Sequence, residues 1–378
     1  MMDRPRTILQ LLPRLDTGGA ERVALEIAQA VQHAGHISLM VAENGPLTHA
    51  ARRAGVEVIH LPVSTKNPFK IWRNTRKLRK IIKQRQVDLI HAHSRAPAWS
   101  GGRAAQQTGV TFITTYHGTY GEKSRLKKRY NQVMVAGARV VAVSRFIAEL
   151  IEARYQINPA RIAVIYNGVD PVKFAPESVR GDRAVSLAKA WRIENGQPAI
   201  LLPARLTGWK GQHVFIRALA QMQNKEAVGI LIGSDQGRHG YTQELLALAE
   251  QLGVGGRLRL VGHVEDMPAA LKLADVVVNC STEPEAFGRT IIEAQAMGKI
   301  VVATDHGGAR ETIIPNVSGF LVPPGNVEAL ALALDTILEG DMGLRLAFGA
   351  QARAEVVEHF SQGIMQARYM ALYEELLS

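Results

Sequence analysis

Two glutamates eight residues apart form the pattern with the clearest chemical content. Glu285 and Glu293 bracket a segment that we expect to run from a loop into a helix beginning at about Gly288. This geometry places the first carboxylate in the loop and the second on the helix, with the amide donors near Phe287 and Gly288 between them. Two acceptors that flank a set of amide donors suit a ligand with many hydroxyls and with phosphates. Acid/base catalysis by the pair is a competing functional interpretation. A purely structural interpretation is that the carboxylates stabilise a helix N-terminus by their negative charge.

Two cations follow the strand-like run Ile200–Ala204. Arg205 and Lys210 lie in the segment Arg205-Leu206-Thr207-Gly208-Trp209-Lys210-Gly211. A guanidinium supplies directional donors and an ammonium supplies a compact charge, so the two side chains can converge on a diphosphate. The alternative, two exposed cations on a loop, is weaker because both residues follow the same strand.

A glycine pair follows the first strand-like run. Gly18 and Gly19 stand directly before a helical pattern. Paired glycines let backbone amides approach an anion closely, and the helix N-terminus adds a favourable dipole, so this turn could hold a phosphate. The pair does not complete a dinucleotide-binding or P-loop motif, and a tight strand-to-helix turn explains it equally well.

Histidines end two strand-like runs of the first half. His117 follows Thr111–Thr115 and faces the expected ligand crevice, either as a substrate contact or as part of the crevice wall. His91 and His93 alternate at the end of another run. A metal site there needs further ligands, and no nearby His, Asp or Glu supplies them, so we expect no metal.

Short β-branched runs alternate with helical patterns along the chain, which is typical of a doubly wound, parallel α/β sheet. The runs expected as strands in the first half are Ile8–Leu12, Ile37–Val41, Val56–Leu61, Val87–Ala92, Thr111–Thr115, Val140–Val143 and Ile162–Ile165. Those in the second half are Ile200–Ala204, Gly229–Gly233, Leu258–Val261, Val276–Asn279, Ile300–Ala303 and Gly319–Val322. The polar stretch from Pro171 to Gln197 has no such run and predicts a hinge between two lobes.

Length and composition agree with two lobes. The chain has 378 residues, of which 47% are hydrophobic and 21% charged, so it can bury full cores and is not a disordered or fibrous protein. Its one cysteine, Cys280, cannot form an internal disulfide, which favours the cytoplasm. No run reaches the roughly 18 to 20 apolar residues that span a bilayer, and we expect no cleaved export signal.

Positive charge is concentrated in the first half. Residues 1–173 carry a net charge of +16 and residues 174–378 carry −5, which together make the formal +11. This uneven distribution of charge suggests that one lobe faces a polyanion. The alternative is a basic surface that keeps the protein soluble. Lys66–Gln86 predicts an amphipathic helix with nine cations and no acidic residue, and Lys123–Arg129 adds a second basic cluster. We favour an anionic membrane surface over nucleic acid, because few aromatic residues are interleaved with these cations.

Taken in order, the motifs resemble the retaining family 4 glycosyltransferases of GT-B fold. The glutamate pair is followed by Gly298-Lys299-Ile300-Val301-Val302-Ala303-Thr304 and Gly307-Gly308-Ala309-Arg310-Glu311. The other similar segments are Gly18-Gly19-Ala20-Glu21-Arg22, Tyr116-His117-Gly118, Val143-Ser144, Tyr166-Asn167-Gly168-Val169-Asp170, Arg205 with Lys210-Gly211, Gly233-Ser234-Asp235 and Gly262-His263. The chain departs from the family at Ser234-Asp235, where Asp often follows the glycine directly, and at Gln362, near a frequent tryptophan.

The resemblance implies a role for each candidate residue. Glu293 would bind the donor ribose, and Glu285 would bind hydroxyls of the transferred sugar together with the backbone of Phe287 and Gly288. The remaining roles are neutralisation of the diphosphate by Arg205 and Lys210, an amide contact to it from the Gly18–Gly19 turn, a contact from His117 to the sugar near the reacting centre, and a border of the base at Gly262.

The resemblance also implies a domain plan and an activity. Two Rossmann-like domains would face each other across a cleft: 1–172 binding the acceptor and 197–355 the nucleotide sugar, with a linker at 173–196 and a C-terminal helix at 356–378 that can cross back. We expect a retaining hexosyltransferase, acting without a cofactor at the inner face of the cytoplasmic membrane. It would move a hexose-type sugar from a nucleoside-diphosphate sugar to a lipid-linked or cell-envelope glycan, such as lipopolysaccharide core or a surface polysaccharide. The alternatives are a nucleotide-sugar epimerase of the same architecture and a nucleic-acid-binding protein.

Overall fold

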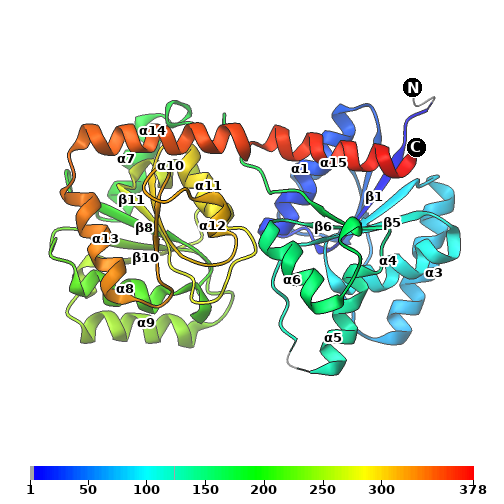
Figure 1. Cartoon of the computed structure of the whole chain (residues 1–378), viewed down its shortest axis with the longest axis horizontal. Coiled ribbons are helices and arrows are strands. Elements are labelled where there is room, and N and C mark those ends of the chain that lie inside the picture. The colour runs from blue at the N-terminus through cyan, green and yellow to red at the C-terminus, as the bar shows by residue number, and fades with distance from the viewer. Residues whose placement is uncertain (1–3, 123) are drawn as a thin grey trace. The chain divides into compact units, whose positions relative to one another are not determined.

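The computed structural model describes residues 4–122 and 124–378 and divides into two compact units (Figure 1). Unit 1 combines the residues up to Asn167 with Gln362–Ser378, and unit 2 comprises Gly168–Ser361. Each unit is built on one parallel sheet with helices on both faces, so the expected α/β class with two doubly wound sheets is confirmed.

The sheet of unit 1 has seven strands in the order β3-β2-β1-β4-β5-β6-β7. Their bounds are β1 Thr7–Arg14, β2 Ile37–Glu43, β3 Glu57–His60, β4 Leu89–Ala92, β5 Thr111–Tyr116, β6 Arg139–Ala142 and β7 Ile162–Val164. The runs predicted as strands in the first half all coincide with them, because buried parallel strands are almost continuously apolar.

The helices of unit 1 cover both faces of its sheet. They are α1 Gly19–His33, α2 Thr48–Arg53, α3 Pro68–Gln84, α4 Arg95–Thr108, α5 Arg125–Asn131, α6 Arg145–Tyr155 and the C-terminal α15 Gln362–Leu377. On one face, Val23 and Ile27 of α1 and Tyr369 of α15 pack with Ile8 and Ile113 of the sheet. The final helix of the chain is therefore part of the hydrophobic core of unit 1.

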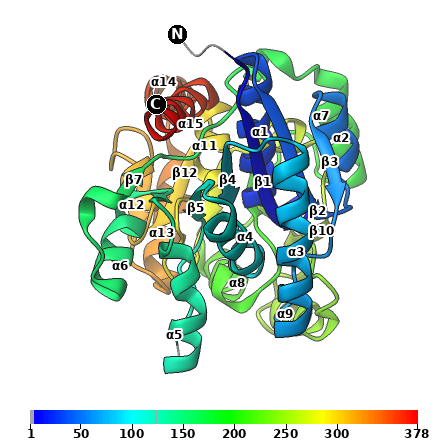
Figure 2. The same cartoon turned by 90° about the vertical axis from the view of Figure 1, so that its right-hand side faces the viewer.

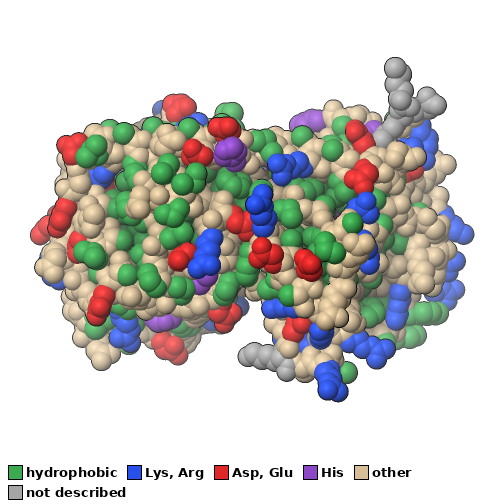
Figure 3. All heavy atoms as spheres, in the orientation of Figure 1, with side chains coloured by type: hydrophobic (Ala, Val, Ile, Leu, Met, Phe, Trp, Pro, Cys, Tyr) green, Lys and Arg blue, Asp and Glu red, His purple; other side chains and the backbone are tan. Residues whose placement is uncertain are grey.

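The predicted amphipathic helix at Lys66–Gln86 is α3. It buries Ile71, Leu78 and Ile82 and exposes its cations, except for Arg79, which is half-buried. Figure 2 shows α4 between α3 and α5, and none of these three helices contains an acidic residue. Figure 3 shows Lys and Arg side chains along this part of unit 1. Lys123, the first cation of the second cluster, lies outside the described residues.

Large apolar side chains are exposed among these cations. Phe69 is 68% and Trp72 is 49% exposed on α3, and Leu126 is 81% exposed on α5. The rings of Phe69 and Trp72 stack at 5.8 Å, and the guanidinium of Arg76 lies 4.8 Å from the Trp72 ring centre. We call the exposed residues of α3 and α5 the basic surface. No helix in the described part of the chain is long and apolar enough to cross a membrane.

The sheet of unit 2 has six strands in the order β10-β9-β8-β11-β12-β13. Their bounds are β8 Ala199–Pro203, β9 Val228–Ile232, β10 Leu258–Gly262, β11 Val276–Asn279, β12 Ile300–Thr304 and β13 Phe320–Val322. Each coincides with a run predicted in the second half.

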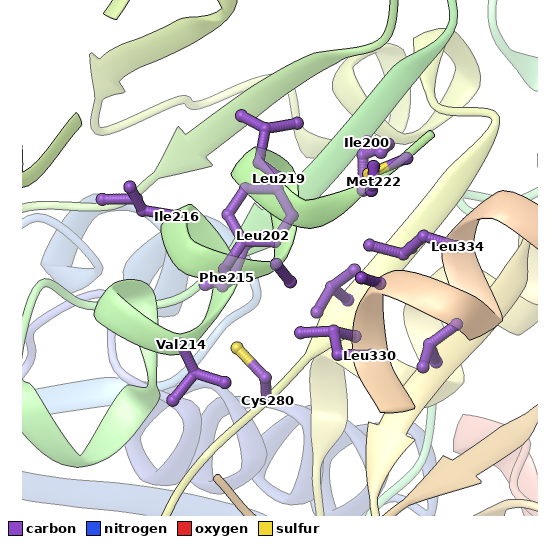
Figure 4. Packing of buried hydrophobic residues seen from close by; sticks show 14 of the residues in the cluster. Ile200, Leu202, Val214, Phe215, Ile216, Leu219, Met222, Cys280, Leu330 and Leu334 are labelled. Atoms are coloured by element: carbon purple, nitrogen blue, oxygen red, sulfur yellow. The ribbon is translucent and has the colours of Figure 1, made fainter. Parts of the chain in front are cut away.

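The helices of unit 2 enclose a large apolar core (Figure 4). They are α7 Gly181–Ala190, α8 Gln212–Gln221, α9 His239–Gln251, α10 Met267–Leu273, α11 Arg289–Ala296, α12 Ala309–Thr312, α13 Val327–Glu339 and α14 Met342–His359. Phe215 of α8 and Leu330 of α13 are completely buried in this core with Leu202 of β8.

Residues 173–196, which the sequence analysis assigned to a linker, are part of unit 2 and contain α7. This helix packs against α10, and the guanidinium of Arg183 binds both carboxylate oxygens of Asp266, at 2.6 and 2.8 Å. Pro176 and Gly181 stand at the first positions of a 3₁₀ turn and of α7. The same residue types that break helices also begin them, which is why this segment resembled a linker.

Each sheet has a point where the strand order reverses. In unit 1 this point lies between β1 and β4, because the chain continues from β1 to β2 on one side and from β4 to β5 on the other. In unit 2 it lies between β8 and β11, from which the chain continues to β9 and to β12. Loops that leave such a pair of strands diverge, which opens a crevice beyond their carboxyl ends. Gly18, Gly19, Arg205, Lys210 and Glu285 follow these strands, whereas His117 follows β5 and Gly262 ends β10.

Candidate active site

Lys210 and Glu285 meet at the strand reversal of unit 2. Lys210 follows β8 and Glu285 follows the neighbouring β11, and the ammonium Nζ lies 2.6 Å from carboxylate Oε1. Both side chains are 14% exposed. The ammonium also lies 4.2 Å from the ring centre of Trp209. One cation and one carboxylate that were predicted from separate motifs therefore form one charged pair.

A glycine allows the Lys210 loop to approach β11. Gly211 has φ of +76°, and a Cβ atom there would lie 1.9 Å from the carbonyl oxygen of Cys280. Only glycine adopts this backbone conformation readily and leaves room for the carbonyl. The amide of Thr282 donates to the carbonyl of Trp209 at 2.7 Å, which joins the two loops on the other side of Lys210.

Polar residues at the end of β11 hold the Glu285 carboxylate. The hydroxyl of Ser281 donates a hydrogen bond to Oε1 of Glu285, and Oγ of Ser281 also lies 3.2 Å from Oδ1 of Asn279. Burial raises the pKa of the Glu285 carboxyl, but Lys210, through its charge and hydrogen bond, and the hydrogen bonds from Ser281 and Asn279 outweigh this effect. The pKa of Glu285 is therefore lowered, and the side chain is ionised at neutral pH.

The loop after β12 supports the backbone of Glu285. The amide of Gly308 donates to the Glu285 carbonyl at 3.0 Å. Gly307 has φ of +59°, and a Cβ atom there would lie 2.5 Å from the same carbonyl oxygen. The glycine pair in the segment Gly307-Gly308 is thus required by close packing of two backbones.

Helix α11 begins next to this carboxylate. Gly288 precedes it with φ of +91° and, as a glycine, has no side chain to cap the helix. The N-terminus of a helix carries a partial positive charge, so the start of α11 is suited to an anionic ligand. Glu293 is buried within the helix, and its Oε1 lies 3.7 Å from Nε of Arg289. Phe287 is buried and its ring meets that of Phe360 edge to face at 5.8 Å, so Phe287 can present only backbone atoms.

Arg205 and Gly262 lie at the carboxyl ends of β8 and β10, the two strands that flank β9 in unit 2. Arg205 lies two residues after the end of β8 and is exposed. Gly262 ends β10 with φ of +71° and accepts a hydrogen bond from the amide of Gly233 at 2.7 Å. Both residues therefore lie along the carboxyl edge of the sheet that also holds Lys210 and Glu285.

The candidate residues of unit 1 form two groups at the carboxyl edge of its sheet. Gly18 and Gly19 are exposed at the start of α1, after β1. His117 follows β5, and its Nε2 lies 3.0 Å from Nδ1 of His93, which follows β4. His93 Nε2 in turn lies 2.7 Å from Oε1 of Gln10 in β1.

The sequence analysis did not identify the residues that hold these side chains. Asn279 and Ser281 carry a weak signal, namely polar residues at the end of a buried apolar strand. Gln10 carries a similar signal, since it interrupts the apolar strand β1 with an amide that is completely buried. In the described part of the chain, no group of three or more His, Cys, Asp and Glu side chains is arranged to hold a metal ion.

Comparisons with known proteins agree with this arrangement. Residues 17–173 match the family model described as Glycosyltransferase Family 4, and residues 186–355 match the model described as Glycosyl transferases group 1. A glycosyltransferase of known structure from Rickettsia africae ESF-5 is 34% identical, with a TM-score of 0.91 over 99% of both chains. Anabaena HepE, solved in complex with UDP-glucose, is 26% identical, with a TM-score of 0.85 over 97% of this chain and 99% of its own.

A curated relative gives the same assignment. The D-inositol 3-phosphate glycosyltransferase of Xylanimonas cellulosilytica is 29% identical over 374 residues, which cover 90% of this chain and 87% of that protein. Two family models match, a GT-B glycosyltransferase structure aligns over nearly the whole chain, and charged residues lie at the strand ends. The chain therefore belongs to family 4 (group 1) of the GT-B glycosyltransferases and is a hexosyltransferase with a nucleotide-sugar donor.

Proposed function

We propose that this chain is a retaining glycosyltransferase that moves a hexose-type sugar to a lipid-linked or cell-envelope glycan, such as lipopolysaccharide core or a related surface polysaccharide. The ion pair between Lys210 and Glu285 at the strand reversal of unit 2 supports this proposal most. It puts a cation for the leaving phosphate beside a carboxylate that can accept hydrogen bonds from sugar hydroxyls.

The cations of unit 2 are proposed to stabilise the leaving group. Breaking the anomeric C–O bond builds negative charge on the nucleoside diphosphate, and fixed donors aimed at that charge lower the barrier. Lys210, Arg205 and the first-turn amides of α11 supply such donors. Because these groups already provide positive charge, we propose that turnover requires no divalent metal.

The other candidate residues are proposed to bind the rest of the donor. Glu293 would bind the ribose, Gly262 would border the base, and the backbone of Phe287 and Gly288 would assist Glu285 at the transferred sugar. In unit 1, the amides of Gly18 and Gly19 would contact the diphosphate and His117 the sugar. With the diphosphate leaving on one face of the sugar, attack by the acceptor on the same face would retain the anomeric configuration without a glycosyl-enzyme.

UDP-glucose is the first donor to test, because it is bound by HepE. The experiment compares thermal unfolding of the chain with UDP-glucose, GDP-glucose and ADP-glucose. A donor present at 100 times its Kd stabilises the native state by about 2.7 kcal/mol and raises the Tm. We expect one base to be preferred; no shift with any of the three would contradict the proposed function.

Transfer is distinguished from epimerisation by the fate of the sugar. A glycosyltransferase releases nucleoside diphosphate, and release accelerates when a glycan acceptor is added. An epimerase would convert the donor sugar into its epimer with no acceptor present. Proton NMR of the product reports the anomeric configuration, and an inverted configuration would overturn the retaining mechanism.

The basic surface of unit 1 is proposed to contact the inner leaflet of the cytoplasmic membrane. Cations on helices that contain no acidic residue attract an anionic leaflet, each by about 1 kcal/mol near the surface. Exposed Phe69 and Trp72 are suited to the headgroup boundary, where aromatic rings lie with one side apolar. This location would bring the enzyme to a lipid-linked acceptor.

Vesicle co-sedimentation tests this surface. We expect binding to phosphatidylglycerol-containing vesicles and not to pure phosphatidylcholine, with weaker binding of a Phe69→Ala, Trp72→Ala double variant. Leu332→Ala is the matched control, since Leu332 is 68% exposed on α13 of unit 2. Equal sedimentation with both vesicle types would contradict the proposal, and retention of an oligonucleotide on a filter, without vesicle binding, would favour a nucleic-acid-binding protein.

A further inference from the structure

A chain of hydrogen bonds crosses three adjacent strands of unit 1 and ends at His117. Gln10 lies in β1, His93 directly follows β4, and His117 directly follows β5. Oε1 of Gln10 lies 2.7 Å from His93 Nε2, and His93 Nδ1 lies 3.0 Å from His117 Nε2. The direction in which each bond donates can be worked out from the buried end of this chain.

The amide of Gln10 sets the first direction. Its Nε2 donates to the backbone carbonyl of Ala24 at 3.0 Å, and a carbonyl oxygen can only accept. The reversed amide would place Oε1 against that carbonyl, two acceptors in contact in a completely buried position. Oε1 therefore faces His93, and the His93 Nε2–H is the donor.

The neutral His93 ring carries one N–H proton. Its side chain is 2% exposed, and the His91 ring lies 4.0 Å from its own, centre to centre. Burial, with smaller contributions from His91 and His117, holds the pKa of His93 well below its ordinary value, so the imidazole is neutral. With the proton on Nε2, His93 Nδ1 is an acceptor, and the hydrogen bond between the rings must be donated by Nε2–H of His117.

We propose that Gln10 and His93 are positioning residues that hold His117 with its Nε2–H directed at His93, which disfavours the Nδ1–H tautomer, so that His117 Nδ1 accepts a hydrogen bond from a hydroxyl of the transferred sugar. The assignment of the sugar to His117 rests on the proposed function. The tautomer itself rests only on Gln10, Ala24 and the two histidine rings.

Gln10 determines which of two proton arrangements the histidine pair adopts. Two neutral imidazoles joined by one hydrogen bond can exchange donor and acceptor, which would move the proton of His93 to Nδ1 and that of His117 to its own Nδ1. Such a shift would turn His117 from an acceptor into a donor toward the substrate. The Gln10 carbonyl oxygen requires a donor and thereby selects one of the two arrangements.

Imidazole ¹⁵N NMR of the full chain, without any ligand, tests the tautomer. Protonated and unprotonated ring nitrogens resonate in separate regions, and His117→Gln and His93→Asn variants assign the two residues. We expect Nε2–H for both histidines at pH 7.5. A His117 signal from the Nδ1–H tautomer in the unsubstituted chain overturns the proposal, and this result requires no variant to fold.

A second measurement tests the role of Gln10. Gln10→Met removes the acceptor at similar volume and is expected to give a mixture of both tautomers at His93 and His117. An unchanged spectrum of a folded Gln10→Met variant overturns the role of Gln10. Should that variant not fold, the pair His93→Asn and His93→Leu replaces it: the asparagine oxygen keeps an acceptor for His117 Nε2–H, and leucine does not.

The link to the sugar is tested with UDP-glucose and UDP. We expect the His117 Nδ1 resonance to shift with UDP-glucose and to remain with UDP alone. His93→Leu should raise the KM for UDP-glucose or lower kcat by about tenfold, the effect of one lost hydrogen bond, while His93→Asn recovers most of it. Equal shifts with UDP overturn the sugar contact, whereas failure of any sugar nucleotide to bind overturns the proposed function and leaves the tautomer intact.

Discussion

The ammonium of Lys210 lies 2.6 Å from the carboxylate of Glu285 although the two residues are 75 positions apart in the chain. The pair joins the loops that leave β8 and β11, the two strands between which the order of the sheet reverses. A ligand bound beyond these strand ends meets a cation, a carboxylate and the amides of a helix N-terminus within one unit.

Replacement of Lys210 by methionine should reduce turnover strongly. If the ammonium supplies about 3 kcal/mol of stabilisation to the departing diphosphate, kcat falls by about 10²-fold or more. The measurement is the release of UDP from UDP-glucose. Lys189→Met is the control, because Lys189 is exposed on α7 of the same unit. A Lys210→Met variant with near-normal kcat would contradict the assignment.

Removal of metal ions should leave turnover nearly unchanged. The positive charge at the proposed diphosphate position comes from Lys210, Arg205 and backbone amides, none of which a chelator removes. The same UDP-release assay is run after dialysis against EDTA and again after addition of Mg²⁺. Strong inhibition that Mg²⁺ reverses would show that a metal carries the leaving-group charge.

The two glutamates should separate binding of the nucleotide from binding of the sugar. Glu293→Gln, at the proposed ribose contact, should weaken binding of UDP and UDP-glucose alike, and Glu285→Gln should weaken UDP-glucose more than UDP. Hydrogen bonds to charged groups contribute about 1.5–3 kcal/mol, so Kd should rise by roughly 10- to 100-fold in each case. Isothermal titration calorimetry with both ligands measures the contrast, and identical profiles for the two variants would remove the distinction between their roles.

Stability should decrease in mild acid because of two buried histidines. Burial lowers the pKa of His91 and His93 well below 6.5, so both are neutral when the chain is folded and take up protons on unfolding. From about pH 6.5 downward to the lowered pKa values, the free energy of unfolding should therefore fall by up to about 1.4 kcal/mol per pH unit for each group. Urea unfolding at several pH values measures how the free energy of unfolding changes with pH. The His91→Asn variant should take up about one proton fewer on unfolding, which reduces this slope by up to about 1.4 kcal/mol per pH unit. An unaltered slope in that variant would mean that His91 is not buried in its neutral form.

A pair of glycine variants separates backbone strain from close packing. Gly211→Ala and Gly253→Ala both force alanine into positive φ, at +76° and +68°, which costs roughly 1–2 kcal/mol. Only at Gly211 does the added Cβ also meet the carbonyl of Cys280, which adds about 1–3 kcal/mol for the forced displacement. Gly211→Ala should therefore unfold at lower denaturant and lose activity, because it moves Lys210. Equal stability of the two variants would show that the loop relaxes without cost.

The amino-acid sequence determined the strands and the α/β class. Each predicted strand run is a strand, and the α/β class follows from the alternation of apolar runs with amphipathic ones. The last helix, predicted at 356–378, spans Gln362–Leu377, because α14 continues to His359. These features are local, since a strand or a helix is selected by the spacing of apolar side chains within ten to twenty residues. The carboxyl-edge position of Arg205, Lys210 and His117 follows from the same alternation.

Only the tertiary structure decided which side chains meet. The pairing of Lys210 with Glu285 depends on β8 lying beside β11, and the chain from Gln10 through His93 to His117 depends on β1, β4 and β5 being neighbours. The helix α7 within residues 173–196 likewise forms because Ala184 and Trp191 are buried when the segment packs in unit 2, although its Pro and Gly residues resemble those of a linker. Strand order and packing arise from the whole set of buried surfaces, which no single segment of sequence contains.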